Sequence, residues 1–289
     1  MKYKKAISIL VFCIVLLSLV STVFGIVSNQ GNGQYAFQSL RGETVTIYGK
    51  GLYHYDSVPM VAQGIAQDIV TLFLGIPLLI ISLFWARKGF LKGRLLLTGT
   101  LGYFLYTYIS YTFLWMFNPL FLIYVLLMSA SFFAFTLSMI SFDIEQMKAS
   151  FHEKLPIKFI GGFQIFFSTA LGLMWLGRIV PSIINGSIPL GLEHYTTLVI
   201  QGMDLGFIVP IAFISGILIL KRNNFGYLLS SVIIIKGFTM GAALTAMIIA
   251  QAVAGVPMSF LEIMMFPLFS LLIVWCLVLM LKNINENAH

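Results

Sequence analysis

Long runs of apolar residues, separated by short polar stretches, dominate the chain. A helix that crosses a membrane needs about 20 consecutive, predominantly apolar residues. Eight runs reach that length, at residues 6–28, 58–86, 95–116, 119–141, 159–180, 201–220, 226–251 and 259–281. The pattern therefore predicts an all-α fold, a polytopic transmembrane bundle of eight helices.

The first run could instead belong to a signal peptide, because the basic segment MKYKK precedes it and small residues end it. Its apolar stretch from Ala6 to Val27 is longer than the roughly 7–15 residues of a signal-peptide core. We therefore expect an uncleaved first helix, and in either case we expect the chain after Val27 to lie outside.

Residues 29–57 form a long polar segment between the first two runs. Within this segment, TVTIY and LYHYD alternate apolar or aromatic residues with polar ones on either side of Gly49-Lys50-Gly51. Alternation around a glycine-containing turn is typical of a β-hairpin. We expect a short extracytoplasmic hairpin here, with a flexible polar loop as the alternative.

Basic residues are concentrated in alternate connections between the runs. These clusters are Lys2, Lys4 and Lys5, segment 87–94, Lys148, Lys154 and Lys158, Lys221 and Arg222, and Lys282. Loops rich in Lys and Arg remain on the cytoplasmic side. With eight helices, the alternation predicts that both termini are cytoplasmic.

The composition supports a membrane location. Hydrophobic residues make up 59% of the 289 positions and charged residues only 9%, and the mean hydropathy is +0.97. Soluble domains are roughly 45–50% apolar and 25% charged. Since the basic loops explain the net charge of +7, we expect no nucleic-acid partner. We predict a multi-pass protein of the cell membrane, surrounded by the lipid bilayer.

Two stretches of the sequence are similar to each other. LYHYDSVPMVAQGIAQD ends at Asp68, and LEHYTTLVIQGMD ends at Asp204. Both contain a His-Tyr pair, a Gln and a Gly, and both end in an Asp close to a long apolar run. We therefore predict two four-helix halves, 1–141 and 142–289. Because four is an even number, the halves would have the same orientation, as in the parallel repeats of some transporters.

Ionisable residues inside membrane spans are costly and are candidates for function. Counted from the cytoplasmic boundaries at about 1.5 Å per residue, Asp68, Asp204, Arg178 and Glu262 come to the outer edge of the membrane, whereas Lys236 lies near its middle. The alternative for both aspartates is a capping role at a helix start, or a polar contact between helices with a backbone N–H, Tyr or Arg of the same half. We expect the two carboxylates to face one shared cavity.

These positions favour a transporter or ion-coupled permease. Its polar site would be open to the outside and lined by Asp68, Asp204, Glu262, Arg178, Gln67 and Tyr111, with Lys236 deeper in the bundle. Tyr111 belongs to a stripe with Tyr103, Thr107 and Ser110, which share a helix face. The excess of acids predicts a cation, a proton or an amine-bearing solute as the substrate. Pro77 and Pro210 interrupt corresponding helices and could permit bending.

A membrane enzyme acting at the outer leaflet is the main alternative. His54, Asp56 and His194 would be its outer-face groups or ligands, since the two His-Tyr pairs are equivalent in the repeat. A non-catalytic membrane subunit of a larger complex is a third possibility. The spacing predicts no metal site, familiar catalytic motifs are absent, and the sequence specifies no cofactor or protein partner.

Overall fold

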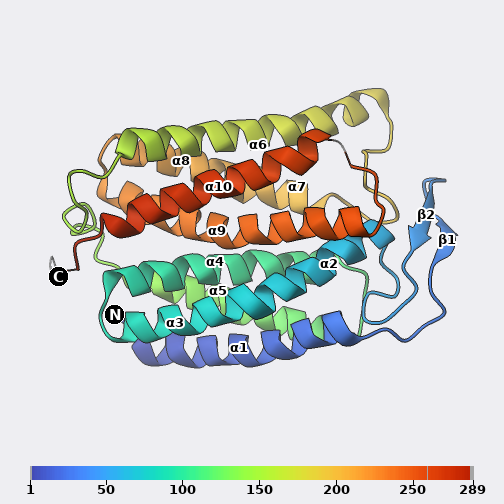
Figure 1. Ribbon diagram of the computed structural model, residues 1–289, viewed down its shortest axis with the longest axis horizontal. Coiled ribbons are helices and arrows are strands. Elements are labelled where there is room, and N and C mark those ends of the chain that lie inside the picture. The colour runs from blue at the N-terminus through green and yellow to red at the C-terminus, as the bar shows by residue number, and fades with distance from the viewer. Residues whose placement is uncertain (1, 259, 287–289) are drawn as a thin grey trace.

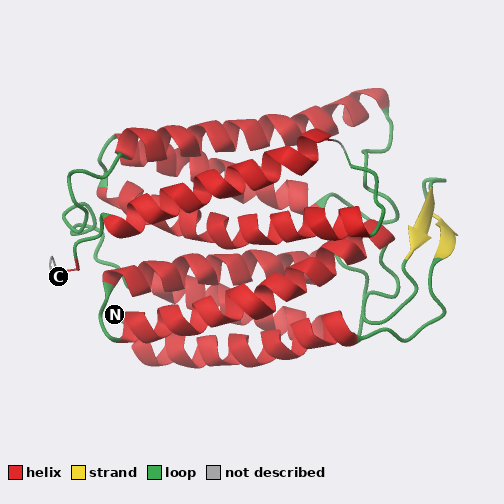
Figure 2. Cartoon of the chain, viewed as in Figure 1, coloured by secondary structure: helices red, strands yellow, loops and turns green. Residues whose placement is uncertain are grey.

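The computed structural model describes residues 2–258 and 260–286, apart from the side chains of Leu261 and Glu262. The helices run side by side along the long axis, and a small β-hairpin lies at one end (Figure 1, Figure 2). Helix α1 begins and helix α10 ends at the opposite end. We call these two ends the hairpin end and the terminal end.

The described helices match the apolar runs to within a few residues. Their bounds are α1 Lys4–Val27, α2 Val58–Val70, α3 Ile76–Arg87, α4 Leu91–Phe113, α5 Phe121–Met139, α6 Ile157–Asn185, α7 Val199–Met203, α8 Val209–Leu220, α9 Asn224–Val253 and α10 Phe260–Lys282. Two π-helical turns, η1 Thr71–Gly75 and η2 Asp204–Ile208, make α2–η1–α3 and α7–η2–α8 continuous.

When α2–η1–α3 and α7–η2–α8 are each counted as one helix, seven helices among the described residues are long and apolar enough to cross a membrane. This is expected for a multi-pass membrane protein. Helix α4, which is rich in Gly, Thr and Tyr, is not one of them, although it has 23 residues. Helix α1 packs on α2, α3 and α5, and its Ile7, Val11 and Ile14 are fully buried. The first apolar run is therefore part of the bundle.

Each π-helical turn lies just before a proline. Pro77 and Pro210 each follow the first residue of their turn by the same number of positions. A proline ring inside a regular α-helix clashes with the carbonyl one turn earlier and leaves it unbonded. The wider π turn absorbs this conflict. The amide of Ile76 bonds to the carbonyl of Thr71, and that of Val209 bonds to Asp204.

Several other matching features are separated along the sequence by the same number of residues that separates Pro77 from Pro210. Gly93 lies so close to the preceding helix that a Cβ there would be 2.5 Å from the backbone nitrogen of Ala86, and Gly226 stands in the same relation to Ile219. Ser82 donates to the carbonyl of Leu79 as Ser215 does to that of Ala212. Equal numbers of residues separate the members of four pairs: Thr71 and Asp204, Pro77 and Pro210, Ser82 and Ser215, and Gly93 and Gly226.

Helices α1–α5 gather in one part of the bundle and α6–α10 in the other (Figure 1). Helices α4 and α9 pack against each other between these groups, and α2 packs closely on α9. The corresponding contact between α4 and α7 is much smaller. The two groups therefore meet asymmetrically, which leaves space beside α7.

The hairpin is present, but its pairing differs from the prediction. Strand β2 Thr44–Ile47 pairs antiparallel with β1 Tyr35–Gln38. The segment 52–56 contacts β2 only through turns and an isolated bridge from Ile47 to Ser57. Leu52 and Tyr53 are buried, so this segment turns into the bundle and cannot continue as an exposed strand.

Candidate functional site

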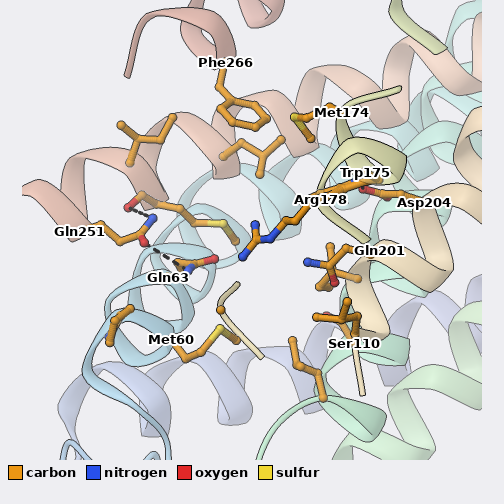
Figure 3. Close-up of a pocket in the computed structure, with 18 of the residues that line it drawn as sticks. Met60, Gln63, Ser110, Met174, Trp175, Arg178, Gln201, Asp204, Gln251 and Phe266 are labelled. Atoms are coloured by element: carbon orange, nitrogen blue, oxygen red, sulfur yellow. Dashed lines mark hydrogen bonds between the residues drawn. The ribbon is translucent and has the colours of Figure 1, made fainter. Parts of the chain in front are cut away.

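A cavity of about 1720 Å³ lies between the two groups of helices. Residues from α2, α4, α6, α7, α9 and α10 line it, and its mouth includes hairpin residues Glu43 to Thr46 (Figure 3). Most of its lining is apolar, and several methionines contribute, among them Met60 and Met174. The volume exceeds the roughly 300–1,000 Å³ of ordinary small-molecule pockets.

Asp204 is the acidic group in the interior of this cavity. One carboxylate oxygen accepts a hydrogen bond from the Tyr106 hydroxyl at 2.8 Å, and the other accepts from the indole N–H of Trp175 at 2.9 Å. Tyr106 comes from α4 and Trp175 from α6, so Asp204 joins both groups of helices. Asp204 begins a π turn inside a continuous helix and does not cap a helix start.

Lys236 lies on α9 and also lines the cavity. Its ammonium group is 3.9 Å from the centre of the Tyr106 ring, and Asp204 is the acid whose charge acts on it. The side chain is only 7% exposed. Among the described residues, the ammonium has no hydrogen-bond or ion-pair partner. A buried cation without a partner is costly, so this position calls for a functional explanation.

Arg178 brings a second cation to the cavity, nearer the hairpin end. Its guanidinium donates to the carbonyl of Leu190 through Nε at 2.8 Å and through Nη2. These two bonds leave Nη1 free. Figure 3 shows the guanidinium pointing into the cavity, between Gln201 and Gln63. Gln63 donates to Gln251 across the α2–α9 contact at 3.3 Å.

Asp68 has different surroundings and does not line the cavity. It is 2% exposed, and it accepts hydrogen bonds from Tyr53 at 2.5 Å and Tyr111 at 2.9 Å. Gly25 of α1 lies directly against the carboxylate. All three neighbours belong to the first group of helices or its outer loop, so Asp68 is enclosed there. The expectation that both carboxylates face one shared cavity is therefore wrong: Asp204 lines the cavity, whereas Asp68 bonds tyrosines of its own half, as the alternative predicted.

Gly25 permits this enclosure, and replacing it should destabilise the fold. A Cβ at Gly25 would overlap the Asp68 carboxylate and lie 2.8 Å from the Tyr53 hydroxyl. We expect Gly25→Ala to lower the free energy of unfolding by about 1–3 kcal/mol, measured by thermal denaturation in detergent. Gly162→Ala in α6 is the control, because nothing lies within 4 Å of a Cβ there. Equal midpoints for the two variants would contradict this close packing.

Gln67 joins a buried polar network on α4. Its amide donates to Tyr103 at 2.7 Å and to Thr107 at 3.1 Å, and Tyr103 also bonds Thr71 at 2.7 Å. Three residues of the stripe on α4 line the cavity, namely Thr107, Ser110 and Tyr111. Gln67 of α2 lines it as well. Tyr103 is completely buried and does not.

The predicted outer-face groups, His54, Asp56 and His194, make contacts that connect the loops at the hairpin end. Asp56 is 1% exposed and accepts from the amide of Met116 at 3.1 Å and from the Tyr195 hydroxyl at 3.0 Å. His194 Nε2 lies 2.9 Å from the carbonyl of Tyr55. The rings of His54 and His194 contact the hairpin rings Tyr35 and Phe37. Within the described residues, no group of three or more His, Cys, Asp or Glu side chains could hold a metal ion.

Asp56 should make the stability of these loops depend on pH. Burial raises the pKa of its carboxyl to about 7, with Glu193 adding to the rise, although the bonds from Met116 and Tyr195 oppose it. The stability from this group is complete below pH about 4 and is lost as the pH rises through about 7. We expect the protein to be more stable at pH 5 than at pH 8, by about 2–4 kcal/mol.

Asp56→Asn is the matched variant, because its amide oxygen still accepts from Met116 and Tyr195 but cannot ionise. Thermal midpoints in detergent at the two pH values should differ less for Asp56→Asn than for the wild type. The same pH dependence in both proteins would rule out Asp56 as its source.

The structure thus brings together most of the predicted site residues. Asp204, Arg178, Gln67, Tyr111 and Lys236 line one cavity. Asp68 is enclosed elsewhere, and the side chain of Glu262 lies outside the described residues. Tyr106 and Trp175 were not predicted. Trp175 lies one turn from Arg178 and Tyr106 one turn from Tyr103, so helical spacing is the signal that could have identified them.

Comparison of the chain with protein-family models, with curated proteins and with solved structures found no match.

Proposed function

We propose that the chain is a transporter of the cell membrane, a permease whose site opens to the outside at the hairpin end, with both termini in the cytoplasm. The observation that carries this proposal is the cavity of about 1720 Å³, which extends from the hairpin to Asp204 and Lys236. A cavity of this depth, lined by charged groups inside a membrane bundle, is typical of a solute pathway.

The proposal includes eight spanning helices in two like-oriented halves, 1–141 and 142–289. Helix α4 would be the eighth span, because its 23 residues extend about 34 Å and it packs on α3, α5 and α9. The recurrent π turns, prolines and glycine contacts support an internal repeat. Their common interval pairs Thr71, and not Asp68, with Asp204.

The same interval pairs Tyr103 with Lys236, which suggests how the halves have diverged. In the first half, Thr71 and Tyr103 form a neutral hydrogen bond in a closed core. In the second half, Asp204 and Lys236 occupy those positions and line the cavity. We infer that the first half supports the structure and that the second half holds the substrate.

The π turns supply a means of movement. An α-helix interrupted by a proline and a π turn has fewer regular hydrogen bonds and bends more easily than an intact one. Because η2 begins at Asp204, bending there would move the carboxylate relative to Tyr106 and Trp175. Closure of the cavity from the outside would then coincide with rearrangement of the site.

Uptake by proteoliposomes tests this function without assuming a substrate. The vesicles are offered a defined mixture of organic acids, amines and amino acids, and their contents are identified by mass spectrometry. The proposal predicts that at least one solute accumulates above the level in empty liposomes. No accumulation would contradict it. Conversion of a solute would favour the membrane enzyme, and a stoichiometric protein that co-purifies would favour the subunit of a complex.

A further inference from the structure

Lys236, in the interior of the cavity, has hydrogen-bonding capacity that no described residue uses. Lys236 is more than nine-tenths buried, lines the cavity and has no hydrogen-bond or ion-pair partner in the part of the chain that the structure describes. The ring of Tyr106 covers one side of its ammonium. An ammonium has three N–H donors, so Lys236 can still donate to a bound oxygen.

The acids of the cavity are less available. Both oxygens of Asp204 already accept hydrogen bonds, from Tyr106 and Trp175. Glu193 has one buried carboxyl oxygen without a hydrogen-bond partner among the described residues, but burial raises the pKa of this carboxyl and favours the neutral form. Arg178 bonds described residues through Nε and Nη2 and not through Nη1, and Figure 3 shows its guanidinium pointing into the cavity. Glu43 lines the cavity only at the hairpin. Deeper than this rim, the charged groups with hydrogen-bond donors that no described residue uses are the cations Lys236 and Arg178.

The walls around these cations are suited to an apolar body. Four apolar side chains line the space between Lys236 and the mouth: Met240 and Met247 of α9, Met174 of α6 and Phe266 of α10. Methionine is flexible and fits apolar ligands of different shapes. Figure 3 shows Met174 and Phe266 on the side of the cavity opposite Met60.

We propose that the cavity binds an anionic amphiphile, whose single acidic group is held by Lys236 and whose apolar body lies against the methionines, while the charge of Arg178 adds attraction from nearer the mouth. This proposal rests on the proposed function and names the substrate class of that site. It replaces the expectation of a cation, a proton or an amine, which followed from counting acids in the sequence. The ligand could be a membrane lipid or an organic acid from outside.

Binding can be measured by calorimetry with the full chain in nanodiscs of phosphatidylcholine, with empty nanodiscs as the blank. The probes are decanesulfonate, decanol and decyltrimethylammonium, which share a chain and differ in head-group charge. We expect decanesulfonate to bind at least about tenfold more tightly than the other two, a difference that one good charged hydrogen bond can supply. Nanodiscs containing phosphatidylglycerol identify the source. Weaker decanesulfonate binding there indicates a lipid competitor, and unchanged binding indicates an acid from outside.

Variants test directly whether Lys236 holds the acidic group. Lys236→Met should reduce decanesulfonate affinity at least about tenfold, while Lys236→Arg and the exposed control Lys221→Met should retain it. Arg178→Met provides a second test if Lys236→Met does not fold, with a smaller loss expected. Equal affinity for the three probes, tighter binding of decyltrimethylammonium, or full affinity in Lys236→Met would overturn the proposal. Transport of a cation would overturn this inference alone and leave the transporter proposal standing.

Discussion

Asp68→Ala is expected to destabilise the protein by about 2–5 kcal/mol without changing its substrate site. The substitution removes the acceptor from two buried hydroxyls, those of Tyr53 and Tyr111. Tyr53 loses its acceptor, whereas Tyr111 can still donate to the carbonyl of Gly64 at 3.2 Å. A buried donor left without a partner costs about 1–3 kcal/mol. A cavity beside Gly25 adds to the loss. Thermal denaturation in detergent would measure the change.

Asp68→Asn is the matched control for this effect. Its amide oxygen still accepts from one of the two tyrosines, so we expect a smaller loss of stability than in Asp68→Ala. Uptake per folded molecule should remain at the wild-type level in Asp68→Asn. An unchanged melting temperature in Asp68→Ala, or loss of uptake in folded Asp68→Asn, would contradict the structural role of Asp68.

The second large effect is expected from Asp204→Asn combined with Lys236→Met. Neutral groups of similar volume can replace buried charges with little cost to stability, and the asparagine can still accept a hydrogen bond at the position of Asp204. The asparagine oxygen can accept from only one of Tyr106 and Trp175, so we expect the double variant to fold with a stability loss of about 1–3 kcal/mol. Its uptake should fall to the level of empty liposomes, because the two charged groups in the interior of the cavity are gone.

The equivalent pair in the first half provides the control. Thr71→Val with Tyr103→Phe removes the neutral hydrogen bond between these residues and leaves Gln67 with Thr107 alone. We expect a stability loss of about 1–2 kcal/mol and normal uptake per folded molecule. Uptake that survives in the Asp204→Asn, Lys236→Met variant, or fails in the control, would reverse the roles given to the two halves.

The helices were predictable because hydrophobicity along a membrane span is a property of local composition. Every apolar run became a helix, and the runs broken by Pro77 and Pro210 remained continuous through π turns. The π turns themselves were not predictable, since a proline favours several local solutions and packing selects among them.

The pairing of the two aspartates was misleading for a physical reason. Asp68 and Asp204 look equivalent because similar residues surround them, but in the proposed repeat the positions of the two π turns pair Asp204 with Thr71. A shift of three residues displaces a side chain by about 4.5 Å along the helix axis and turns it by about 60°. Asp68 consequently meets Tyr53 and Gly25 in a closed core, whereas Asp204 faces the cavity. Tyr106 and Trp175 were missed because tertiary packing, and not a motif, brings them to Asp204.

The hairpin shows the same limit. The alternation in Thr44–Ile47 correctly predicted a strand, but the pattern of 52–56 is equally compatible with burial. Tyr53 enters the bundle to donate to Asp68, and this long-range contact determines the local structure of its segment. Strand β2 therefore pairs with Tyr35–Gln38.

Accessibility of Met240→Cys tests the central claim most directly, namely that the cavity leads from the outside to Lys236. Met240 lines the cavity one turn from Lys236. Ser131→Cys on α5 is the control, because Ser131 is fully buried. In a chain with Cys13→Ser and Cys276→Ala, a membrane-impermeant maleimide added to intact cells should modify the cysteine at position 240 and not that at position 131. No modification at position 240 from outside would contradict the account.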